Sequence, residues 1–484
     1  MQKMDLSLLS SPAAFLKKRL GKNIYDAVLQ GYEAWWSKEG KEISTLVDRH
    51  GTPWIKRYDQ AGNRIDNILY PKEYEHMLYK GYETGIIWRA FEDSSLLPHY
   101  LLGYLTSYFD PGLYCPYTVS MATAAPFHKY GTKEIKEKYF DNLLKKDDSV
   151  WQGATRMTEI KGGSDLGTNV ETIASPNGDH YLLNGEKYFC SNAHAEVAVV
   201  AARIERAPKN IKGLALFLVP RNRDDGTLNY TLDRLKDKIA THSVPTGEIT
   251  LKDSMGYLLG KETGIYQIME VLNISRTANC IASVGLAQRA LHEAYQFAKD
   301  RVAFGKPIIE QPLLKAQFEE KTKLLDNAFA LAWETVILLD EVWLQTPPYS
   351  DRYDLFRLMA HLGKYWTAEY AVQTAKWTME VNGGLGTLHE FPVERWLREA
   401  MILSIWEGTP HRQILDGLEV MEKKGAHKLL LAHLKPFAAE TEIRDWEQRI
   451  EEHLGLTQEE KEARAEVFFN KLAGFTAQCL SGKT

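Results

Sequence analysis

The sequence predicts an α+β protein in which helical and strand-rich parts follow one another along the chain. We expect an N-terminal helical domain over residues 1–150, a β-domain over 151–264, a C-terminal four-helix bundle over 265–420 and a helical extension over 421–484. Two observations carry this prediction. Apolar residues recur every three to four positions in the outer parts, whereas short apolar or alternating runs bounded by turn residues fill the middle part. A chain of 484 residues is also long enough for about two to four domains.

The first 150 residues are predicted to form helices interrupted by one hairpin. Aromatic and aliphatic residues share a helical face in IYDAVLQGYEAWWSKEG and again in EYEHMLYKGYETGIIWRAFED. Between these two segments we expect a short hairpin near residues 52–70, with its turn at Ala61-Gly62-Asn63.

The β-domain is predicted from turn signals and from the runs between them. ETIASPNGDHYLLNGEKYFCSN contains Asn177-Gly178 and Asn184-Gly185, and each dipeptide is a hairpin signal. The runs AEVAVVAARI, GLALFLVPR and GEITLKD that follow have the length and the pattern of strands. Short strands at this spacing indicate a small sandwich or barrel.

The helical period returns after Gly264. Long segments begin at Gly264, Leu313 and Leu355, and a fourth leads to Glu407, so a helix bundle is expected. The segments HKLLLAHLKPF, EIRDWEQRIEEHL and TQEEKEARAEVFFNKL then predict charged helices in the extension.

Composition excludes several classes of function. The formal net charge of −5 gives no general attraction to nucleic acid or to anionic membranes. The four cysteines are far apart and form no CxxC pair, so neither a disulfide framework nor a metal site is predicted. No apolar run approaches the roughly 20 residues that cross a bilayer, and the N-terminus lacks the apolar core of a signal peptide. We therefore predict a soluble, cytoplasmic protein with no membrane span.

The first motif is MTEIKGGSD, from Met157 to Asp165, at the entry to the β-domain. Its two glycines and its serine permit close backbone approach, with N–H groups suited to a diphosphate or to the edge of a flat ring. Taken alone, such a segment is more often an ordinary loop. It is neither a Walker loop nor a GxGxxG motif between a strand and a helix, so no Rossmann site is implied.

The second motif, DRVAFGKPIIEQP, lies at the end of a predicted helix. Arg301 and Phe304 are three residues apart, so we expect them to share a helix face, where a guanidinium and an aromatic ring suit a nucleotide. Gly305 and Pro307 are expected to end the helix. A plain helix terminus is the alternative.

The third motif, EVNGGLGTLHEFPVERWLREA, is a glycine break between two helices. Gly383, Gly384 and Gly386 are expected to end one helix before Pro392 opens the next. A connecting loop without a ligand is the alternative here.

A second break follows in REAMILSIWEGTPHRQILDGL, where Glu407 stands beside Gly408, Thr409 and Pro410. A glutamate in such a place is usually a solvated charge or part of a helix cap. Offered from a break between two helices, it is also in a position to act as an aimed base.

In this order and combination, TEIKGGSD, KYFCSN, RVAFGKP, the glycine break and WEGT resemble the acyl-CoA dehydrogenase flavoprotein family. The fold of that family is helical, then β, then helical. The chain is most similar to the alkylation-response (adaptive-response) branch through RYDQAGNRIDNILYP, CPYTVSMATAAP, RLKDKIATHS, GYLLGKETG and FGKPIIEQPLL. Ile160 stands where common members have proline. Ala240 stands where many relatives have glycine, so we expect the local substrate-side loop to differ.

The resemblance implies FAD as the cofactor and assigns residues to it. Met157 and Thr158 would face the edge of the flavin ring, and Ser164 the diphosphate. Phe189 replaces a stacking tryptophan, and Ser191 replaces a threonine. Arg301, Phe304 and Gly384 would reach the FAD of a neighbouring subunit, so a homodimer or homotetramer is implied. Glu380 stands where many relatives have glutamine, and the remaining cofactor residues implied are Gly163, Gln311, Gly383, Trp406 and Thr409.

For catalysis, the resemblance makes Glu407 the general base that removes the proton beside a thioester carbonyl. A carboxylate in a dry pocket has a raised pKa and is a stronger base. Ser275 stands where some members carry their base instead, so no rival glutamate competes. Arg276 resembles an arginine of the substrate pocket, with a helix-surface role as the alternative, and Ser164 is also assigned to the substrate.

Two functions stay open at this point. The first is an FAD-dependent acyl-CoA dehydrogenase that passes electrons to an electron-transferring flavoprotein. The second is a flavin- and acyl-CoA-binding protein with a sequestering or protective role and little turnover.

From Leu415 onward the chain carries about 10 Lys and Arg against about 13 Asp and Glu, which argues against DNA as a partner. Nitroalkane oxidation on the same fold would be expected to use aspartate, and Glu407 speaks against it.

Overall fold

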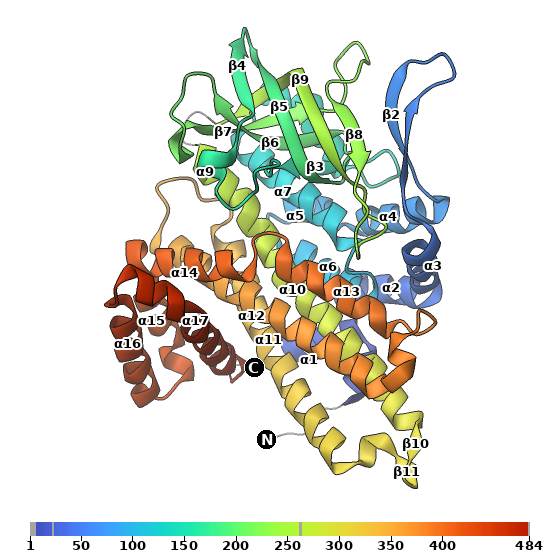
Figure 1. The fold of residues 1–484 in the computed structure, drawn as a ribbon, viewed down its shortest axis with the longest axis vertical. Helices are drawn as coiled ribbons and strands as arrows, with labels where there is room; N and C mark the ends of the chain where they lie inside the picture. Colours follow the sequence, from blue (N-terminus) through green and yellow to red (C-terminus); the bar gives the residue numbers. More distant parts are fainter. Residues whose placement is uncertain (1–5, 22–23, 261–263, 483–484) are drawn as a thin grey trace. The chain divides into compact units, whose positions relative to one another are not determined.

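The computed structural model describes residues 6–21, 24–260 and 264–482. Residues 261–263 of the motif GYLLGKETG lie outside the described residues. The order of helical, strand-rich and helical segments predicted from the sequence is confirmed (Figure 1). The chain forms two compact units, and the domain ranges given above stay a prediction. The helical unit comprises Met1–Ala34, Gly103–Phe109 and Arg276–Thr484, and the barrel unit comprises Trp35–Leu102 and Asp110–Ser275.

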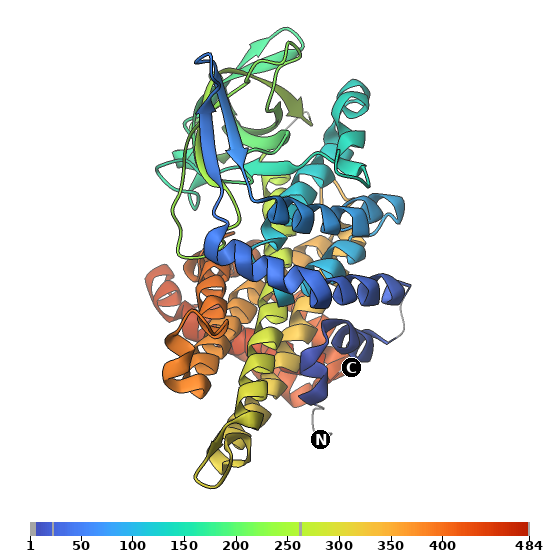
Figure 2. The ribbon, with the colours of Figure 1, turned by 90° about the vertical axis from the view of Figure 1, so that its right-hand side faces the viewer.

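The helical unit is built of long helices, and two of these, apart from α2 (Asp26–Trp35) whose last residue falls in the barrel unit, contribute whole turns to both units. The shared helices are α6 (Leu97–Phe109) and α10 (Gly264–Asp300). Two strands of two residues each, β10 (Val302–Ala303) and β11 (Lys306–Pro307), pair with each other in the connection between α10 and α11 (Figures 1 and 2). The other helices of this unit are α1 (Pro12–Leu20), α2 (Asp26–Trp35), α11 (Pro312–Val342), α12 (Asp351–Asn382), α13 (Val393–Ile405), α14 (Pro410–Lys424), α15 (Ala426–Leu434), α16 (Glu440–Leu454) and α17 (Gln458–Ser481).

Helix α12 lies at the centre of this unit. It packs against α11, α13, α14, α15 and α17. Thr378 on α12 donates a hydrogen bond to the carbonyl of Ala290 on α10. The predicted bundle is therefore present, and the charged C-terminal segment forms the helices that were expected. Helix α17 lies along α11 and α14, so the extension buries its apolar side against the bundle.

The strands of the barrel unit close on themselves. The sheet order is β3-β6-β4-β5-β9-β7, β6 also pairs with β7, and β8 adds to β9. The ring β6-β4-β5-β9-β7 is thus a small barrel, one of the two forms that the sequence left open. Its interior is apolar, with Val200, Phe217, Leu232 and Ile249 buried. The strands are β3 (Gly153–Arg156), β4 (Ile173–Asn177), β5 (His180–Ser191), β6 (Val197–Ile204), β7 (Leu214–Pro220), β8 (Thr231–Leu235) and β9 (Thr246–Leu259).

The helices of this unit lie mostly before the barrel in sequence. Helix α7 packs on β3, and Thr123 Oγ1 donates to the carbonyl oxygen of Ala154 at 2.9 Å. The predicted hairpin near residues 52–70 is confirmed as β1 (Trp54–Tyr58) paired with β2 (Arg64–Leu69). The helices are α3 (Lys41–His50), α4 (Lys72–Thr84), α5 (Trp88–Glu92), α7 (Tyr114–Tyr130), α8 (Lys133–Ile135) and α9 (Leu166–Asn169).

Only one of the two predicted Asn-Gly turns is a turn. Asn177-Gly178 lies at the reversal between β4 and β5, as predicted. The hairpin predicted at Asn184-Gly185 is wrong, because both residues lie inside β5. The pairing register with β9 shifts there, and Gly185 has φ +155°. A Cβ on Gly185 would lie 2.5 Å from Thr172 Oγ1, so the glycine serves close approach within the barrel.

The described residues lack two kinds of feature. Over 6–21, 24–260 and 264–482, no helix is long and apolar enough to cross a membrane. The same residues contain no cluster of three or more His, Cys, Asp or Glu side chains placed to hold a metal ion.

We expect Gly185→Ala to lower the stability of the barrel unit by roughly 2–3 kcal/mol, because the new methyl group overlaps Thr172 in the tightly paired sheet. This corresponds to a loss of about 4–10 °C in melting temperature, measured by thermal unfolding followed by circular dichroism. Gly178→Ala is the matched control, since Gly178 also has positive φ but no atom within 4 Å of an added Cβ. It should cost about 1 kcal/mol. Equal losses in the two variants would contradict the close-approach explanation.

Candidate active site

The break that carries Glu407 lies in the helical unit between α13 and α14, as the sequence predicted. Helix α13 ends at Ile405, and α14 begins at Pro410 with Thr409 as its cap. Glu407 has φ +58° and Gly408 has φ +100°, both in the left-handed region. A non-glycine residue is uncommon in that region and persists there only where its surroundings enforce it. The backbone of Glu407 is therefore held by its neighbours.

One holding group comes from α12. The ammonium of Lys364, which is 1% exposed, donates to the carbonyl oxygens of Ser404 at 2.7 Å and Gly408 at 2.8 Å. Ser404 belongs to the last turn of α13, where carbonyl groups have no partner within the helix. The lysine thus satisfies one carbonyl on each side of Glu407.

Three further side chains complete this set of donors. Gln413 Nε2 donates to the carbonyl oxygens of Glu407 at 3.0 Å and of Gly408 at 3.1 Å. Arg276 Nε also donates to the Glu407 carbonyl, at 3.3 Å. Asn279 Nδ2 donates to a carbonyl oxygen earlier in α13, that of Leu403, at 2.9 Å. Helices α10, α12 and α14 therefore all hold the backbone around Glu407.

A buried histidine sets the orientation of the Gln413 amide. His361 Nδ1 lies 2.9 Å from Gln413 Oε1. Burial, with the charge of Arg276 adding to it, lowers the pKa of His361 to about 3, so the ring is neutral. Because the amide nitrogen of Gln413 donates to the carbonyls, its oxygen accepts, and His361 Nδ1 must carry the ring proton. His361 thereby keeps the Gln413 donors pointed at the break.

The carboxyl of Glu407 is a strong candidate for proton transfer near neutral pH. Its residue is half-buried, and burial raises the pKa of Glu407 to about 7, against the opposing charges of Arg276 and Lys364. Burial also lowers the pKa of Lys364 to about 7, against the influence of Cys280 and Glu407. A carboxyl with a pKa near the working pH is well suited to general-base chemistry.

Arg276 is not a surface residue. It is 3% exposed, and its guanidinium also meets Asp416 with Nη2 3.4 Å from Oδ2. The helix-surface alternative is therefore wrong. Its assignment to the substrate stays a prediction.

Sequence reasoning did not find Lys364, Gln413, Asn279 or His361. The one available signal was Lys364 itself, a lysine within the mostly apolar segment LFRLMAHLGKYW. A lysine inside an apolar stripe either snorkels to water or has a buried partner, and only the fold distinguishes the two.

The first motif and the KYFCSN segment lie together in the barrel unit. The N–H of Tyr188 donates to the carbonyl oxygen of Thr158 at 2.9 Å. Arg156, the residue before Met157, is buried and donates through Nη1 to the carbonyl oxygen of Ser191 at 2.9 Å. The predicted residues Met157, Thr158, Phe189 and Ser191 are thus brought into one neighbourhood, although Met157 itself is buried.

Phe189 stands out from the barrel. The pairing of β5 with β9 is irregular between Lys187 and Cys190, and Phe189 has φ +41°. Bulges of this kind redirect a side chain out of the regular alternation. Phe189 is accordingly 57% exposed, and Ser191 Oγ lies 3.4 Å from Thr246 Oγ1. Phe189, with Lys236 Nζ 4.7 Å from the centroid of its ring and the Ser191 hydroxyl two residues further along the chain, suits a flat heteroaromatic ring.

The loop of the first motif is anchored by a buried ion pair. Lys187 Nζ lies 2.6 Å from Glu159 Oε1, and both side chains are buried. Beyond Glu159, Gly163 and Ser164 are exposed. A Cβ on Gly163 would lie 2.5 Å from Thr158 Oγ1, so the loop folds back on the threonine hydroxyl. The exposed backbone of this loop is therefore held close to Thr158.

The second motif differs from its prediction. Helix α10 ends at Asp300, so Arg301 and Phe304 do not share a helix face, and that expectation is wrong. Phe304 instead has φ +52° at the turn between β10 and β11 and is 97% exposed. Gln311 Nε2 donates to the carbonyl oxygen of Ala303 at 3.2 Å and ties the strand pair to the start of α11. The glycine and proline that were expected to end the helix instead shape the strand pair.

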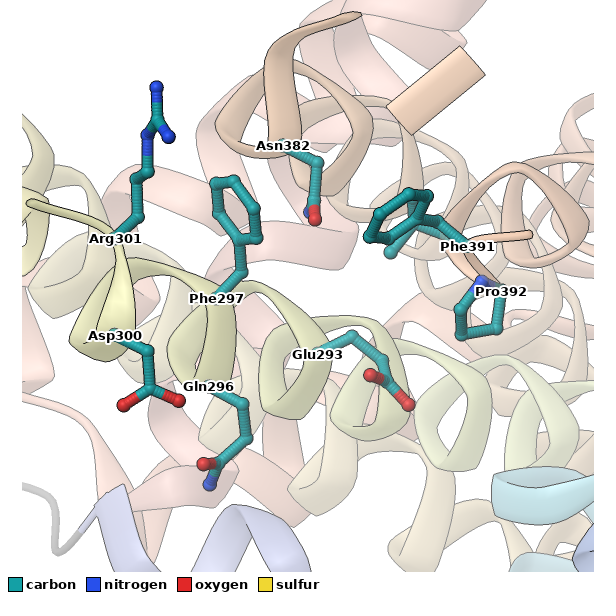
Figure 3. Close-up of a pocket in the computed structure, with 9 residues that line it drawn as sticks. Glu293, Gln296, Phe297, Asp300, Arg301, Asn382, Phe391 and Pro392 are labelled. Carbon is teal, nitrogen blue, oxygen red and sulfur yellow. The ribbon is translucent and has the colours of Figure 1, made fainter. Parts of the chain in front are cut away.

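Arg301 lines a cavity of about 400 Å³ in the helical unit. Figure 3 shows Arg301 and Phe297 rising side by side from the end of α10, with Phe297 next to Asn382 and Phe391 beyond it. Two carboxylates, those of Glu293 and Asp300, also line it, so Arg301 is the only cation among the lining residues.

In the sequence, the predicted glycine break lies between Asn382 and Phe391, and both of these residues line the cavity. Helix α12 ends at Asn382, and Gly383 has φ +59° in the short 3₁₀ turn that follows. An added Cβ on Gly384 would meet no atom within 4 Å, so its backbone is open to a ligand. Glu380 is exposed and paired with Lys376.

Three family models match the chain in succession. They are the adaptive response protein AidB N-terminal domain over residues 14–148, the acyl-CoA dehydrogenase middle domain over 154–254 and the acyl-CoA dehydrogenase C-terminal domain over 262–421. Their order follows the helical, strand-rich and helical segments of the fold, which defines the class as a flavoprotein dehydrogenase fold. Within this class, the chain belongs to the acyl-CoA dehydrogenase family, whose members are FAD-dependent oxidoreductases.

Three curated relatives cover most of its length. Acyl-CoA dehydrogenase family member 11 of Caenorhabditis elegans is 29% identical over 450 residues, 88% of this chain and 70% of the relative. Putative acyl-CoA dehydrogenase AidB of Escherichia coli is 29% identical over 420 residues, 81% and 73% of the two chains. Probable acyl-CoA dehydrogenase YngJ of Bacillus subtilis is 31% identical over 297 residues, 60% and 73% of the two chains.

Solved structures share the whole fold. The apo-form of Bd2924 superposes with a TM-score of 0.88 at 25% identity, covering 100% of this chain and 99% of the other. Caenorhabditis elegans ACDH-11 in complex with C11-CoA has a TM-score of 0.84 at 24% identity and covers 99% and 88%. An acyl-CoA dehydrogenase complexed with FAD from Bacillus anthracis has a TM-score of 0.75 at 19% identity and covers 99% and 82%.

The raised pKa of Glu407 makes a prediction about stability. Between the ordinary pKa of 4.5 and the folded value of about 7, the unfolded chain ionises while the folded chain keeps the proton. The stability linked to that proton is therefore present below about pH 4.5 and is lost as the pH rises through 7. We expect Glu407→Gln to raise the melting temperature at pH 8 and to change it little at pH 5, an effect on the order of 1–3 kcal/mol.

Glu419→Gln is the control for this measurement, because Glu419 lies on α14 with its side chain 49% exposed and pairs with Lys423 in the same helix. Its effect should be small at both pH values. If Glu407→Gln shifted the melting temperature equally at pH 5 and pH 8, Glu407 would not have a raised pKa.

Proposed function

We propose that this chain is an FAD-dependent acyl-CoA dehydrogenase in which Glu407 removes the proton from the carbon beside the thioester carbonyl. The observation that carries the proposal is the break between α13 and α14. It offers a half-buried carboxyl with a pKa of about 7 from a backbone that Lys364 and Gln413 hold in place.

The chemistry requires such a group. A proton beside a thioester carbonyl is weakly acidic, so the base must be strong, fixed and protected from water. A carboxylate whose ionised form is disfavoured by burial gains basic strength and still loses its proton near neutral pH. The backbone N–H of Glu407 would donate to the thioester oxygen, where negative charge develops as the proton leaves. Base and oxyanion donor would then belong to the same fixed residue.

The residues present fit the flavin. In the barrel unit, the hydroxyls of Thr158 and Ser191 would donate to a flat heteroaromatic group on which the exposed ring of Phe189 would pack, and the backbone at Ser164 is open to a diphosphate. When bound, FAD would accept a hydride from the carbon next to the deprotonated one, leaving a double bond. The cofactor residues proposed in the helical unit are Arg301, Phe304, Gln311, Glu380, Gly383, Gly384, Trp406 and Thr409.

The exposed second motif supports assembly into an oligomer. Phe304 is 97% exposed and Val302 60% exposed, which leaves apolar side chains in water if the chain is alone. We propose a homodimer or homotetramer in which Arg301, Phe304 and Gly384 reach the FAD of a neighbouring subunit. An electron-transferring flavoprotein is the proposed acceptor.

A flavin- and acyl-CoA-binding protein with little turnover is the second candidate. The match of residues 14–148 to the AidB N-terminal domain favours it. It would use the same cofactor and thioester contacts but would not need Glu407 to be chemically active. Proton removal by Glu407 is therefore the property that distinguishes the dehydrogenase from the binding protein.

Anaerobic reduction of the bound flavin by acyl-CoA tests the proposal. We expect at least one of a panel of short, long and branched acyl-CoAs to bleach the flavin absorbance rapidly in a stopped-flow experiment. Glu407→Gln should slow that bleaching by about 10²–10⁴-fold, because removal of a positioned general base costs this much. The acyl-CoA Kd, measured from the spectral shift of the flavin, should change little.

Glu419→Gln is again the control, since its exposed carboxyl should not affect bleaching. Spectral binding of acyl-CoA without bleaching in the wild-type protein would reject the dehydrogenase and support the binding protein. A salt-dependent mobility shift of duplex DNA by the pure protein would overturn the argument against DNA.

A further inference from the structure

Lys364 is buried, and burying its ammonium group costs free energy. It lies at the centre of α12 and is 1% exposed. An ammonium taken out of water loses its hydration, and buried lysines are usually paired with a carboxylate. Over the described residues, the structure records no ion pair for Lys364, and its recorded acceptors are the two backbone carbonyls of Ser404 and Gly408.

Those two carbonyls flank Glu407 in sequence. Ser404 lies in the last turn of α13, at the negative end of that helix, where a cation is favoured. Gly408 lies immediately after Glu407, inside the break. One ammonium therefore bridges the end of a helix to the residue beyond the break, across a span that contains Glu407. Rotation of the Glu407 backbone out of its left-handed conformation would move Gly408 O away from the lysine.

A second contact from the same helix face reinforces this bridge. His361 is three residues before Lys364 and so lies on the same side of α12. It holds Gln413, whose amide donates to the Glu407 and Gly408 carbonyls. Gly408 O thus accepts from both Lys364 and Gln413, which uses both of its lone pairs. Helix α12 holds the break both directly and through α14.

We propose that Lys364 is a positioning residue for Glu407. Its ammonium fixes the carbonyls of Ser404 and Gly408, and this fixes the left-handed backbone that aims the Glu407 carboxyl. The positioning itself stands on the geometry above, whereas its consequence for catalysis rests on the proposed function of Glu407.

The charge of Lys364 has a second consequence at the same site. The ionisable groups that interact with it are Glu407, Arg276, Cys280 and Glu369. A cation near the Glu407 carboxyl favours its ionised form. Removing the cation should therefore raise the pKa of Glu407 further, in addition to loosening the backbone. A purely structural side chain of similar size would loosen the backbone without this electrostatic effect.

The test uses Lys364→Met, which keeps the apolar stem and removes the donors, and Lys364→Gln, which keeps one amide donor. Thr367→Val is the matched control, because Thr367 is equally buried one turn further along α12 and its hydroxyl donates to the carbonyl oxygen of Gly363 in its own helix. The full chain with bound FAD is used throughout. Hydrogen–deuterium exchange with mass spectrometry then reports on peptides covering residues 400–412.

We expect Lys364→Met to speed exchange in the 404–409 segment by about tenfold or more, with Lys364→Gln between it and the wild type. Thr367→Val should change it by less than about threefold. In the bleaching assay, Lys364→Met should lower the limiting rate with little change in the acyl-CoA Kd, and its pH midpoint should move upward.

Unchanged exchange of the 404–409 segment in both Lys364 variants would overturn the proposal, whatever the bleaching assay gives. If Lys364→Met does not fold, the exchange of Lys364→Gln against Thr367→Val decides. An unmoved pH midpoint in the variant would overturn the electrostatic part. Faster exchange in a protein that binds acyl-CoA but never bleaches would support the positioning and reject the dehydrogenase, so the two ideas fail separately.

Discussion

A helix that stops inside a bundle leaves its last carbonyls without partners, and these groups must be satisfied away from water. At the end of α13 this chain meets that constraint with buried side chains from three other helices: Arg276, Asn279, Lys364 and Gln413. Each donor fits only if its own helix has the right rotation and depth. The hydrogen bonds that hold Glu407 therefore also fix the register of α10, α12 and α14 around it.

The barrel unit solves a similar problem in a similar way. The pairing of β5 with β9 is irregular between Lys187 and Cys190, and the buried guanidinium of Arg156 donates to the carbonyl oxygens of Ser191 and Asn192 where β5 ends. The loop of the first motif is held at its base by the buried pair of Glu159 and Lys187. In both units, a buried charged side chain binds the inner side of an irregular backbone segment, and the outer side of that segment stays accessible. This arrangement keeps a binding segment rigid without covering it.

The same geometry serves both candidate functions, because holding a flavin and a thioester needs the same cradle in either case. What distinguishes a catalyst is the state of one carboxyl. Burial disfavours the ionised form of Glu407, while the charges of Arg276 and Lys364 favour it, and the balance leaves its pKa at about 7. A binding protein would gain nothing from that balance, and a carboxyl with a raised pKa lowers the stability of the fold at neutral pH. This loss of stability is understandable if Glu407 acts as a base in catalysis.

Sequence by itself determined the elements and the places where they stop. The 3.6-residue period marked the helices, Asn177-Gly178 marked a turn, and Gly408 with Pro410 marked the break at Glu407, because these signals act over a few neighbouring residues. Only the tertiary structure decided the contacts between residues that are distant in the sequence. Asn184-Gly185 has the composition of a turn, but Thr172 lies against Gly185 within the barrel unit. Arg301 and Phe304 have helical spacing, but α10 ends at Asp300. Lys364 lies more than 40 residues from Glu407 in the sequence, and no local pattern records a hydrogen bond between groups that only folding brings together.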